Sequence, residues 1–322
     1  MSQEIELLLP ESLRPVGTTV TRVNQGQSGA GVYRVEGPAG HFILKRTSAD
    51  EPLDNWTRHL GFQRAAAERG VAPNVVHADA NARVVISEAV REVPFAARYH
   101  TPDTHAETMR LLGQTIRTMH DIPLAYDTPI AAALPFMREM HVAAQAHGPL
   151  PVWVEENVAT LLSETEPASD LAHVASHNDL NPSNLIFDGT RLMLLDWNTV
   201  SANDPYYDLA TVSVFLRMDA DACRRLLAAY FDSTPEPFAE LPVRFLYSRR
   251  LAAGLAGTAL LHVAGLRGYR GASDITLADA PTLVDVYTAM RTGALSMSTG
   301  EGQWRLGMAL HRDARPNAMP AA

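Results

Sequence analysis

The N-terminal third of the chain alternates apolar and polar residues in short runs separated by turn residues. Such alternation is typical of β-strands, whose successive side chains point to opposite faces of a sheet. The runs predict strands at the following positions: 18–24, 32–36, 41–46 and 83–90. The segment 55–69, which lies between the third and fourth of these strands, is predicted to form a helix.

A second pair of short apolar runs lies near the middle of the chain. Residues 185–187 and 192–195 are apolar, and the Asp-Gly pair between them at 188–189 is a strong hairpin-turn signal. The turn sequence Asn-Pro-Ser at 181–183 precedes the first run, so we expect Asn184 to start the first strand. The pattern therefore predicts a β-hairpin outside the N-terminal sheet.

From residue 104 onward the apolar residues recur mainly at helical spacing. Helices are predicted at these positions: 135–147, 152–166, 209–218, 220–232, 237–266 and 277–297. The predicted fold class is α+β. A small five-stranded N-terminal lobe with one helix would occupy residues 1–88, and a mainly helical lobe that contains the hairpin would occupy residues 89–322.

Composition places the chain among ordinary globular proteins, since 46% of its 322 residues are hydrophobic and 20% are charged. The single cysteine, Cys223, cannot form an intrachain disulfide, which suits a reducing compartment. Residues 1–11 are acidic and lack the regions of a signal peptide. The apolar stretch 251–266 is short and contains His262, so we interpret it as a buried helix and not a membrane span. We expect a cytoplasmic protein with no membrane partner.

The net charge of −9 at pH 7 argues against a protein that binds nucleic-acid backbones. Many of the carboxylates lie after residue 150, where they would attract a cationic small molecule by electrostatic steering. The sequence therefore favours a small cationic substrate and no nucleic-acid partner.

The segment around the predicted hairpin holds the most specific chemistry. Asp179 lies five residues before Asn184, and the second hairpin strand ends at Asp196. Phosphoryl transfer needs such a set, because one carboxylate accepts a hydroxyl proton while a carboxamide and a second carboxylate hold Mg²⁺ against nucleotide phosphates. His177 precedes the set and is assigned to packing. Asp208 is predicted to cap the helix that follows.

The N-terminal strands carry features that suit a nucleotide. The loop between the first two strands reads Gly-Gln-Ser-Gly-Ala-Gly at 26–31, and its backbone N–H groups, including those near Ser28 and Gly29, can close over phosphates. Glycine-rich turns are common, so this signal is weak by itself. The motif G-x-x-x-x-G-K-[ST] does not occur in the sequence, which excludes a standard P-loop.

Lys45 is the only lysine in the chain, and it lies on the third predicted strand. Phe42 and Leu44 would face one side of that strand, while Ile43 and Lys45 would face the other. A chain that otherwise uses arginine would use it here too if any cation served. The lone lysine therefore indicates a site that needs a compact ammonium group, such as a phosphate site.

Together, these motifs resemble a known family. The pattern H-x-D-x-x-x-x-N, a hairpin and then D is similar to the catalytic and metal-binding loops of the protein-kinase-like fold. The segments HNDLNPSN, LLDWN, NDPYYDLA and GQSGAGVYRV resemble the aminoglycoside phosphotransferase and choline kinase family of small-molecule kinases. The resemblance extends over residues 17–218 and implies a bilobal fold and an enzyme that uses ATP and Mg²⁺.

The resemblance implies roles for the residues around the hairpin. Asp179 would be the catalytic base, and Asn184 and Asp196 would be the metal ligands. An Asp at the position of Asp208 also braces the catalytic loop in kinase-like folds.

The resemblance also implies how the nucleotide is held. Lys45, Ser28 and Gly29 would contact the phosphates, and the backbone of Glu88 and Val90 would hydrogen-bond adenine.

Kinase-like folds place on the next helix a Glu that pairs with the strand lysine. The helix at 55–69 offers His59 or Gln63 in that register, with Glu68 near its C-terminus and Asp54 at its start. The partner of Lys45 is therefore left open.

The resemblance leaves the identity of the acceptor undecided between the two branches of the family, which act on amino-alcohols such as choline and on aminoglycosides. A choline-like amino-alcohol would need aromatic rings around its cation. The chain offers the following candidate rings: Trp197, Tyr206, Tyr207, Tyr247, Tyr269 and Trp304. The C-terminus PNAMPAA lacks the acidic and aromatic residues common in aminoglycoside enzymes of the 3′ type. The sequence favours an acceptor like choline, ethanolamine or thiamine over an aminoglycoside. An inactive nucleotide-binding regulatory protein is the alternative of another class, and the oligomeric state is open.

Overall fold

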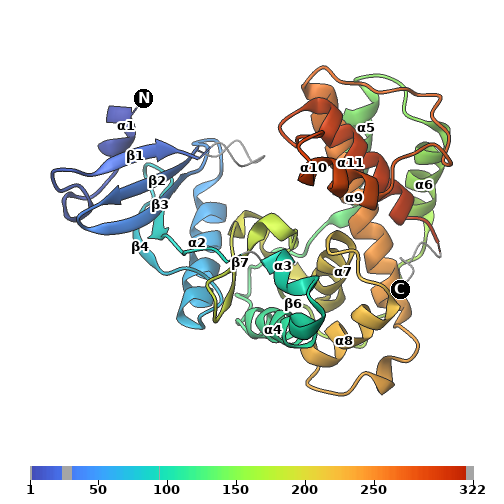
Figure 1. The fold of residues 1–322 in the computed structure, drawn as a ribbon, viewed down its shortest axis with the longest axis horizontal. Helices are drawn as coiled ribbons and strands as arrows, with labels where there is room; N and C mark the ends of the chain where they lie inside the picture. The colour runs from blue at the N-terminus through green and yellow to red at the C-terminus, as the bar shows by residue number, and fades with distance from the viewer. Residues whose placement is uncertain (1, 24–30, 94, 317–322) are drawn as a thin grey trace. The chain divides into compact units, whose positions relative to one another are not determined.

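The computed structural model describes residues 2–23, 31–93 and 95–316 (Figure 1). The chain divides into two compact units. The first comprises residues 1–124 and 182–200, and the second comprises residues 125–181 and 201–322. The hairpin thus belongs to the same unit as the N-terminal sheet. The predicted lobes, 1–88 and 89–322, instead assign the hairpin to the helical lobe, and their boundary stays a prediction.

The first unit contains a five-stranded antiparallel sheet with the strand order β1-β2-β3-β5-β4. The strands are β1 (Thr19–Arg22), β2 (Gly31–Gly37), β3 (Gly40–Arg46), β4 (Val75–Asp79) and β5 (Val84–Glu88). Four of them lie where alternation predicted them. The edge strand β4 has no clear alternation and pairs with β5 through a register shift between Val75 and His77.

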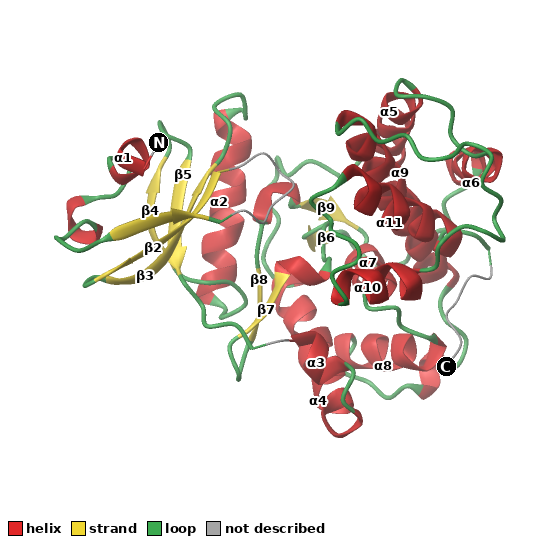
Figure 2. Cartoon of the chain, turned by 45° about the horizontal axis from the view of Figure 1, so that its top comes forward, coloured by secondary structure: helices red, strands yellow, loops and turns green. Residues whose placement is uncertain are grey.

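The two faces of this sheet are covered differently. Phe42 and Leu44 of β3 are buried on one face, in a core that includes Ile5 of the short helix α1 (Ser2–Glu6). The helix α2 (Leu53–Glu68) lies alongside the sheet (Figure 2), and its Gln63 Nε2 donates to Ser87 Oγ of β5 at 3.1 Å. Ser87 pairs with Ile43, so α2 covers the face that also carries Lys45.

The rest of the first unit holds the hairpin. It consists of α3 (Phe95–Tyr99), α4 (Pro102–His120), β7 (Leu185–Phe187) and β8 (Leu192–Leu194). The Leu194 N–H donates to the Val71 carbonyl at 2.9 Å, which fastens β8 to the segment after α2. Asn184 was expected to start a strand, but it ends a 3₁₀ turn over Pro182–Asn184, because the Pro-Ser pair continues the turn.

The second unit is mainly helical and is built around one long helix, Val243–Leu266, which contacts several of the others. Its helices are α5 (Ala133–Gln145), α6 (Val152–Ser163), α7 (Pro205–Phe215), α8 (Ala220–Tyr230), α9 (Val243–Leu266), α10 (Leu283–Arg291) and α11 (Gly300–Asp313). Two short strands, β6 (Val174–Ser176) and β9 (Ser201–Asn203), pair antiparallel beside them.

Helices α9 and α11 approach each other closely because glycines meet at their crossing. A Cβ atom on Gly257 would lie 2.9 Å from the Gly307 carbonyl oxygen, and one on Gly307 would lie 2.9 Å from the Gly257 carbonyl oxygen. Residues with side chains at these positions would push the two helices apart.

Several predicted helix ends were wrong. Helix α9 begins at Val243 after Pro242, not at residue 237, and α10 begins after a capping box formed by Thr282 and Asp285. Helix α11 was not predicted at all, because glycines interrupt its apolar pattern. No described helix has the length and apolar character needed to span a membrane.

Candidate active site

The alternation of β3 turns Lys45 away from the core formed by Phe42 and Leu44, as predicted. The Lys45 Nζ atom donates to Asp196 Oδ1 at 2.6 Å. Both side chains are partly buried, with 23% and 32% of their surface exposed. A residue from the N-terminal sheet thus meets one from the hairpin segment 151 positions later.

The backbone around the hairpin positions Asp196. The residue has φ 61° and ψ 75°, in the left-handed region that Asp tolerates better than most residues. The following 3₁₀ turn, Trp197–Thr199, contacts helix α2, which holds this end of the hairpin against the N-terminal part of the unit. Because α2 and Lys45 share one face of the sheet, this contact brings Asp196 to the lysine.

Asn184 lies beside Asp196 across the hairpin. The Leu195 N–H donates to the Asn184 carbonyl at 2.9 Å, and Asn184 is buried, with 7% of the residue exposed. A carboxylate and a carboxamide supply oxygen ligands, which Mg²⁺ prefers, and Mg²⁺ usually keeps waters or substrate phosphates as its remaining ligands. The donor set therefore fits Mg²⁺, and Asn184 and Asp196 are the residues that could hold it.

The described part of the chain shows no acid of helix α2 bonded to Lys45. His59, one of the residues in the predicted register, instead bonds Glu51 through Nδ1 at 3.0 Å. Burial lowers the pKa of His59, the Glu51 carboxylate raises it, and the charge of Lys45 lowers it further. His59 therefore lies close enough to Lys45 to feel its charge, and the carboxylate that the lysine contacts is Asp196.

The residues predicted to hold the nucleotide are only partly described. Ser28 and Gly29 lie outside the described residues. The backbone N–H of Glu88 donates to the Asn74 carbonyl at 2.9 Å, so that N–H is not available to adenine. Val90 follows β5, and its backbone makes no hydrogen bond within the described part of the chain.

In the second unit, Asp208 braces the loop that leads to Asp179. Its Oδ2 atom accepts from Ser176 Oγ at 2.8 Å and from the His177 N–H at 2.7 Å, and its Oδ1 atom accepts from the Asn178 N–H at 2.8 Å. Asp208 is fully buried. A buried carboxylate with this many donors is strongly held, so the loop is fixed from the side of helix α7.

The prediction that Asp208 caps its helix was wrong. Helix α7 begins four residues earlier than expected, at Pro205, and the cap is Asp204, whose Oδ1 atom accepts from the Tyr206 N–H at 2.8 Å. Asp followed by Pro is a normal start of a helix, because Pro suits the first helical position. Asp208 therefore does not cap the helix, and its carboxylate accepts hydrogen bonds from residues 176–178 instead.

Asp179 lies at the end of this braced loop, in the second unit. Asn181 Nδ2 donates to Asp179 Oδ1 at 2.9 Å. Burial raises the pKa of Tyr207, and the charges of Asp208 and Asp179 raise it further, so the three side chains share one neighbourhood. Lys45, Asn184 and Asp196 come together in the first unit, and the arrangement of Asp179 relative to them stays a prediction.

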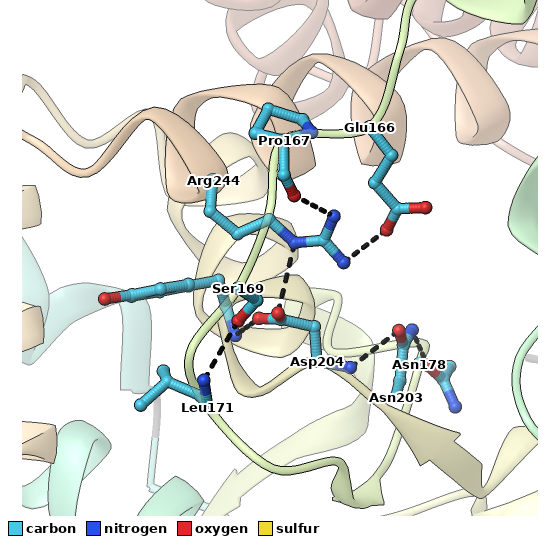
Figure 3. A network of polar contacts seen from close by, with 9 residues as sticks. Glu166, Pro167, Ser169, Leu171, Asn178, Asn203, Asp204 and Arg244 are labelled. Atoms are coloured by element: carbon cyan, nitrogen blue, oxygen red, sulfur yellow. Dashed lines mark hydrogen bonds and ion pairs between the residues drawn. The ribbon is translucent and has the colours of Figure 1, made fainter.

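Sequence reasoning missed a largely buried arginine, Arg244, which belongs to the polar network around this loop (Figure 3). Arg244 Nε donates to Asp204 Oδ2 at 3.1 Å and Nη1 donates to the Pro167 carbonyl at 2.9 Å, while Nη2 pairs with Glu166. The Asp-Pro sequence could have indicated Asp204 as a cap. Arg244 carries no such signal, because it is one of many arginines and its partners are remote in sequence.

The network continues from Asp204 to the loop. The Asp204 N–H donates to Asn203 Oδ1 at 2.8 Å, and Asn203 Nδ2 donates to Asn178 Oδ1 at 2.7 Å (Figure 3). Asn178 also donates to Ser201 Oγ at 2.9 Å. The residue just before Asp179 is thus held from the side of β9 as well as by Asp208.

The aromatic candidates fall into different environments. Trp197 is buried in the first unit, where its Nε1 donates to a backbone carbonyl at 3.1 Å. In the second unit, Tyr207 and Tyr247 line a cavity of about 130 Å³. Tyr269 and Trp304 pack edge to face, with ring centres 6.0 Å apart, and line another cavity of about 560 Å³.

With this geometry established, comparison with known proteins identifies the class. The model of the phosphotransferase enzyme family matches residues 19–244, which is more than half of the chain. The chain therefore belongs to this family, and the predicted family and class of enzyme, a small-molecule kinase, are confirmed.

One curated relative is Protein LicA of Haemophilus influenzae, which is 36% identical over 58 residues. That match covers 18% of this chain and 22% of LicA, so the chain spans about a fifth of the length of the curated relatives it matches.

Three solved structures have similar folds. A choline/ethanolamine kinase family protein from Mesorhizobium loti is 18% identical with a TM-score of 0.59, covering 97% of this chain and 98% of that one. LicA in complex with AMP is 14% identical with a TM-score of 0.60, covering 98% and 97%. An aminoglycoside-3′-phosphotransferase of type VIII is 21% identical with a TM-score of 0.58, covering 79% and 98%. At these identities the similarity shows the fold, and it confirms the predicted kinase-like α+β class.

Proposed function

We propose that this phosphotransferase transfers the γ-phosphoryl group of ATP, with Mg²⁺, to a hydroxyl group of a small cationic molecule. The acceptor is of the amino-alcohol type, like choline, ethanolamine or thiamine. The observation that carries the proposal is the 2.6 Å contact between Lys45 Nζ and Asp196 Oδ1. It joins the lone lysine of the chain to the carboxylate of the proposed metal site.

In this proposal Lys45 binds the nucleotide phosphates from the sheet, while Asn184 and Asp196 hold the metal ion from the hairpin. Mg²⁺ supplies charge neutralisation at the phosphates when it is bound. A carboxylate has two oxygens with several lone pairs, so Asp196 can contact Lys45 through one oxygen and still serve as a ligand. Lys45 keeps a compact, partly exposed ammonium that can turn toward a phosphate.

Asp179 is the proposed base, which orients the acceptor hydroxyl and takes its proton. The support for this role is the bracing of its loop. Asp208 accepts three hydrogen bonds from Ser176, His177 and Asn178, so the base is presented on a fixed backbone. Preorganised positioning is the main protein contribution to phosphoryl transfer.

The nucleotide would be held by the loop with Ser28 and Gly29 over its phosphates and by the backbone after β5 at its adenine. The Glu88 N–H is already used by Asn74, so Glu88 would contribute its carbonyl and Val90 its N–H. AMP in the structurally similar LicA crystal structure supports an adenine nucleotide.

Two features support a cationic amino-alcohol as the acceptor. The chain has a net charge of −9, and the structurally similar proteins include a choline/ethanolamine kinase family member. An aminoglycoside is the second candidate, supported by the similar fold of the type VIII enzyme. Both acceptors are cationic alcohols, so only turnover separates them.

The test is ADP release by the purified protein with Mg²⁺ and ATP in the presence of single acceptors. The panel contains choline, ethanolamine, thiamine, a neutral sugar and an aminoglycoside. We expect release only with the amino-alcohols. ADP release only with the aminoglycoside would instead support an aminoglycoside phosphotransferase. Binding of Mg·ATP without release for any acceptor would favour the regulatory alternative.

The base is tested by Asp179→Asn, with Asp170→Asn as the control because Asp170 is exposed. We expect Asp179→Asn to lower kcat by about 10³-fold and to leave the Kd for Mg·ATP nearly unchanged, because the base does not hold the nucleotide. The control should keep wild-type turnover. Equal turnover by Asp179→Asn and the wild type would remove Asp179 from the mechanism.

A further inference from the structure

Glu51 and His59 form a largely buried pair beside the sheet of the first unit. His59 Nδ1 and Glu51 Oε1 are hydrogen-bonded at 3.0 Å, and the two side chains are 13% and 16% exposed. The second carboxylate oxygen, Glu51 Oε2, is buried and has no hydrogen-bond partner within the described residues. A buried carboxylate oxygen without a donor costs stability, which marks Glu51 as a candidate for a role other than stability.

The pair lies at the end of the sheet that carries Lys45. The Glu51 carbonyl accepts from Arg83 Nε at 3.4 Å. Arg83 directly precedes β5, whose first residue pairs with Arg46 at the end of β3. Lys45 is the residue before Arg46 in the same strand. Glu51 is therefore anchored at the end of the sheet where the lysine lies.

Helix α2 starts at this end of the sheet and places His59 over Lys45 (Figure 2). Gln63 donates to Ser87, and Ser87 pairs with Ile43 of β3. His59 is one helical turn before Gln63. Lys45 is two residues after Ile43, on the same face of the strand. Four residues of helix and two residues of strand both advance the chain by about 6 to 7 Å, so the two side chains lie at the same level.

His59 presents its second ring nitrogen as an acceptor. Burial lowers the pKa of His59 against the opposing effect of Glu51, and the charge of Lys45 lowers it further, so the ring is neutral near pH 7. The Glu51 carboxylate can only accept a hydrogen bond, so Nδ1 carries the proton and Nε2 keeps its lone pair. Within the described residues Nε2 has no hydrogen-bond partner.

No acid on helix α2 can serve Lys45 directly. The two acids of the helix, Asp54 and Glu68, are both exposed. The Lys45 ammonium has three N–H donors and uses one of them, on Asp196. Once Asp196 serves as a metal ligand, the ammonium needs another fixed acceptor to stay directed at the phosphates.

We infer that Glu51 and His59 position Lys45: Glu51 orients the ring of His59, and His59 Nε2 accepts a hydrogen bond from the Lys45 ammonium when the nucleotide is bound. The pair supplies, through an imidazole ring, the negative charge that kinase-like folds place on this helix as a Glu. This inference rests on the proposed kinase function. Both are positioning residues, because neither touches the reacting atoms.

The first test removes each partner. We expect His59→Ala and Glu51→Gln each to lower kcat/KM for ATP by about tenfold, through a higher KM for ATP and a lower kcat, while the KM for ethanolamine as acceptor stays the same. The variant with both changes should be no worse than His59→Ala, because Glu51 acts through the ring. Asp54→Asn changes an exposed acid of the same helix and is the matched control, with wild-type kinetics expected.

The second test moves the carboxylate onto the helix. In a rescue variant that combines Glu51→Gln with His59→Glu, the new carboxylate can accept from Lys45 directly, so kcat/KM should return to within about threefold of the wild type. A merely structural role would not be restored, because this exchange places a charge where a neutral ring had packed. Additive losses when Glu51→Gln and His59→Ala are combined, or no gain in the rescue variant, would overturn the inference.

Calorimetric titration with Mg·ATP in the absence of an acceptor separates this inference from the proposed function. A Kd that rises by about tenfold in His59→Ala and recovers in the rescue variant, without ADP release for any acceptor, would refute the function and support the positioning pair. ADP release by the wild type with unchanged kinetics in His59→Ala would keep the function and refute the pair. No binding of Mg·ATP by the wild type would refute both.

Discussion

The two units each contain a cation held by carboxylates, and the two arrangements differ in burial and in partners. The Lys45 ammonium makes one hydrogen bond within the described residues, to Asp196, and both side chains are partly exposed. Arg244 contacts Asp204, Glu166 and the Pro167 carbonyl, and its side chain is 12% exposed. Lys45 uses one of its three ammonium N–H donors, whereas Arg244 contacts acceptors through all three of its guanidinium nitrogens, Nε, Nη1 and Nη2.

This difference indicates what each pair is for. A partly exposed pair loses little free energy when it opens, because water replaces the partner. A largely buried cation with several acceptors is costly to remove, because the buried Asp204 carboxylate would remain without its counter-charge. Lys45 and Asp196 are therefore suited to exchange partners when a nucleotide binds. Arg244 is suited to hold Asp204 in place and, through Asn203 and Asn178, the loop that leads to Asp179.

The strongest challenge to this comparison is removal of Asp196. We expect Asp196→Ala to lower kcat/KM by about 10³-fold, with weaker metal-dependent binding of ATP, because the metal and Lys45 lose a common ligand. The melting midpoint should change little. Steady-state kinetics and ATP titration with and without Mg²⁺ measure both effects.

Asp121→Ala is the control for Asp196→Ala, since the Asp121 side chain is 61% exposed in the same unit. It should have wild-type kinetics. If Asp196→Ala kept the wild-type affinity for Mg·ATP, Asp196 could not be a metal ligand.

Removal of the buried cation should affect stability. We expect Arg244→Met to lower the free energy of unfolding by about 3 kcal/mol, because Asp204 and Glu166 lose their counter-charge. The control is Arg225→Met, which removes an exposed pair with Asp221 and should cost less than about 0.5 kcal/mol. Urea unfolding monitored by circular dichroism measures both. Equal, small losses would show that the Arg244 cluster does not hold the unit together.

A charge-conserving exchange sharpens the contrast between the two cations. Lys45→Arg keeps the positive charge but replaces a compact ammonium with a planar fork, so we expect kcat/KM to fall by about 10²-fold with stability preserved. Arg46→Lys, the reverse exchange at the next residue of β3, serves as the control and should leave the kinetics unchanged. Full activity of Lys45→Arg would mean that any cation suffices at this position.

The second unit should also respond to acid. Burial lowers the pKa of His311 from 6.5 to about 3, and its ring nitrogens contact Asn157 and Thr258 at 3.2 Å. At a pH between these two pKa values, His311 therefore binds a proton in the unfolded chain but not in the folded chain. The free energy of unfolding should fall as the pH drops below about 6.5, by up to about 1.4 kcal/mol per pH unit.

His311→Asn should make this pH dependence shallower, whereas His173→Asn, at an exposed position, should leave it unchanged. Thermal unfolding between about pH 5 and 7, a range that includes the ordinary histidine pKa, measures how steeply stability depends on pH. Parallel slopes for His311→Asn and the wild type would contradict a neutral, buried His311.

Much of the fold and part of the candidate site could be predicted because the signals are local. The alternation around Lys45 predicted its orientation, and the Asp-Gly turn predicted the hairpin that ends before Asp196. The helix start at Pro205 was missed although Asp-Pro is a local signal. The edge strand β4 was not placed, because its short sequence shows no alternation and its pairing with β5 defines it.

The sequence by itself determined the residue types, their spacing and the family, since these depend on the order of amino acids and on short-range preferences. Only the tertiary structure decided that Lys45 pairs with Asp196 and not with an acid of helix α2, and that Arg244 joins Asp204 to Glu166. Such pairs form between residues far apart in the chain. Their choice depends on how whole elements pack and on which charges that packing removes from water, and no local pattern encodes either.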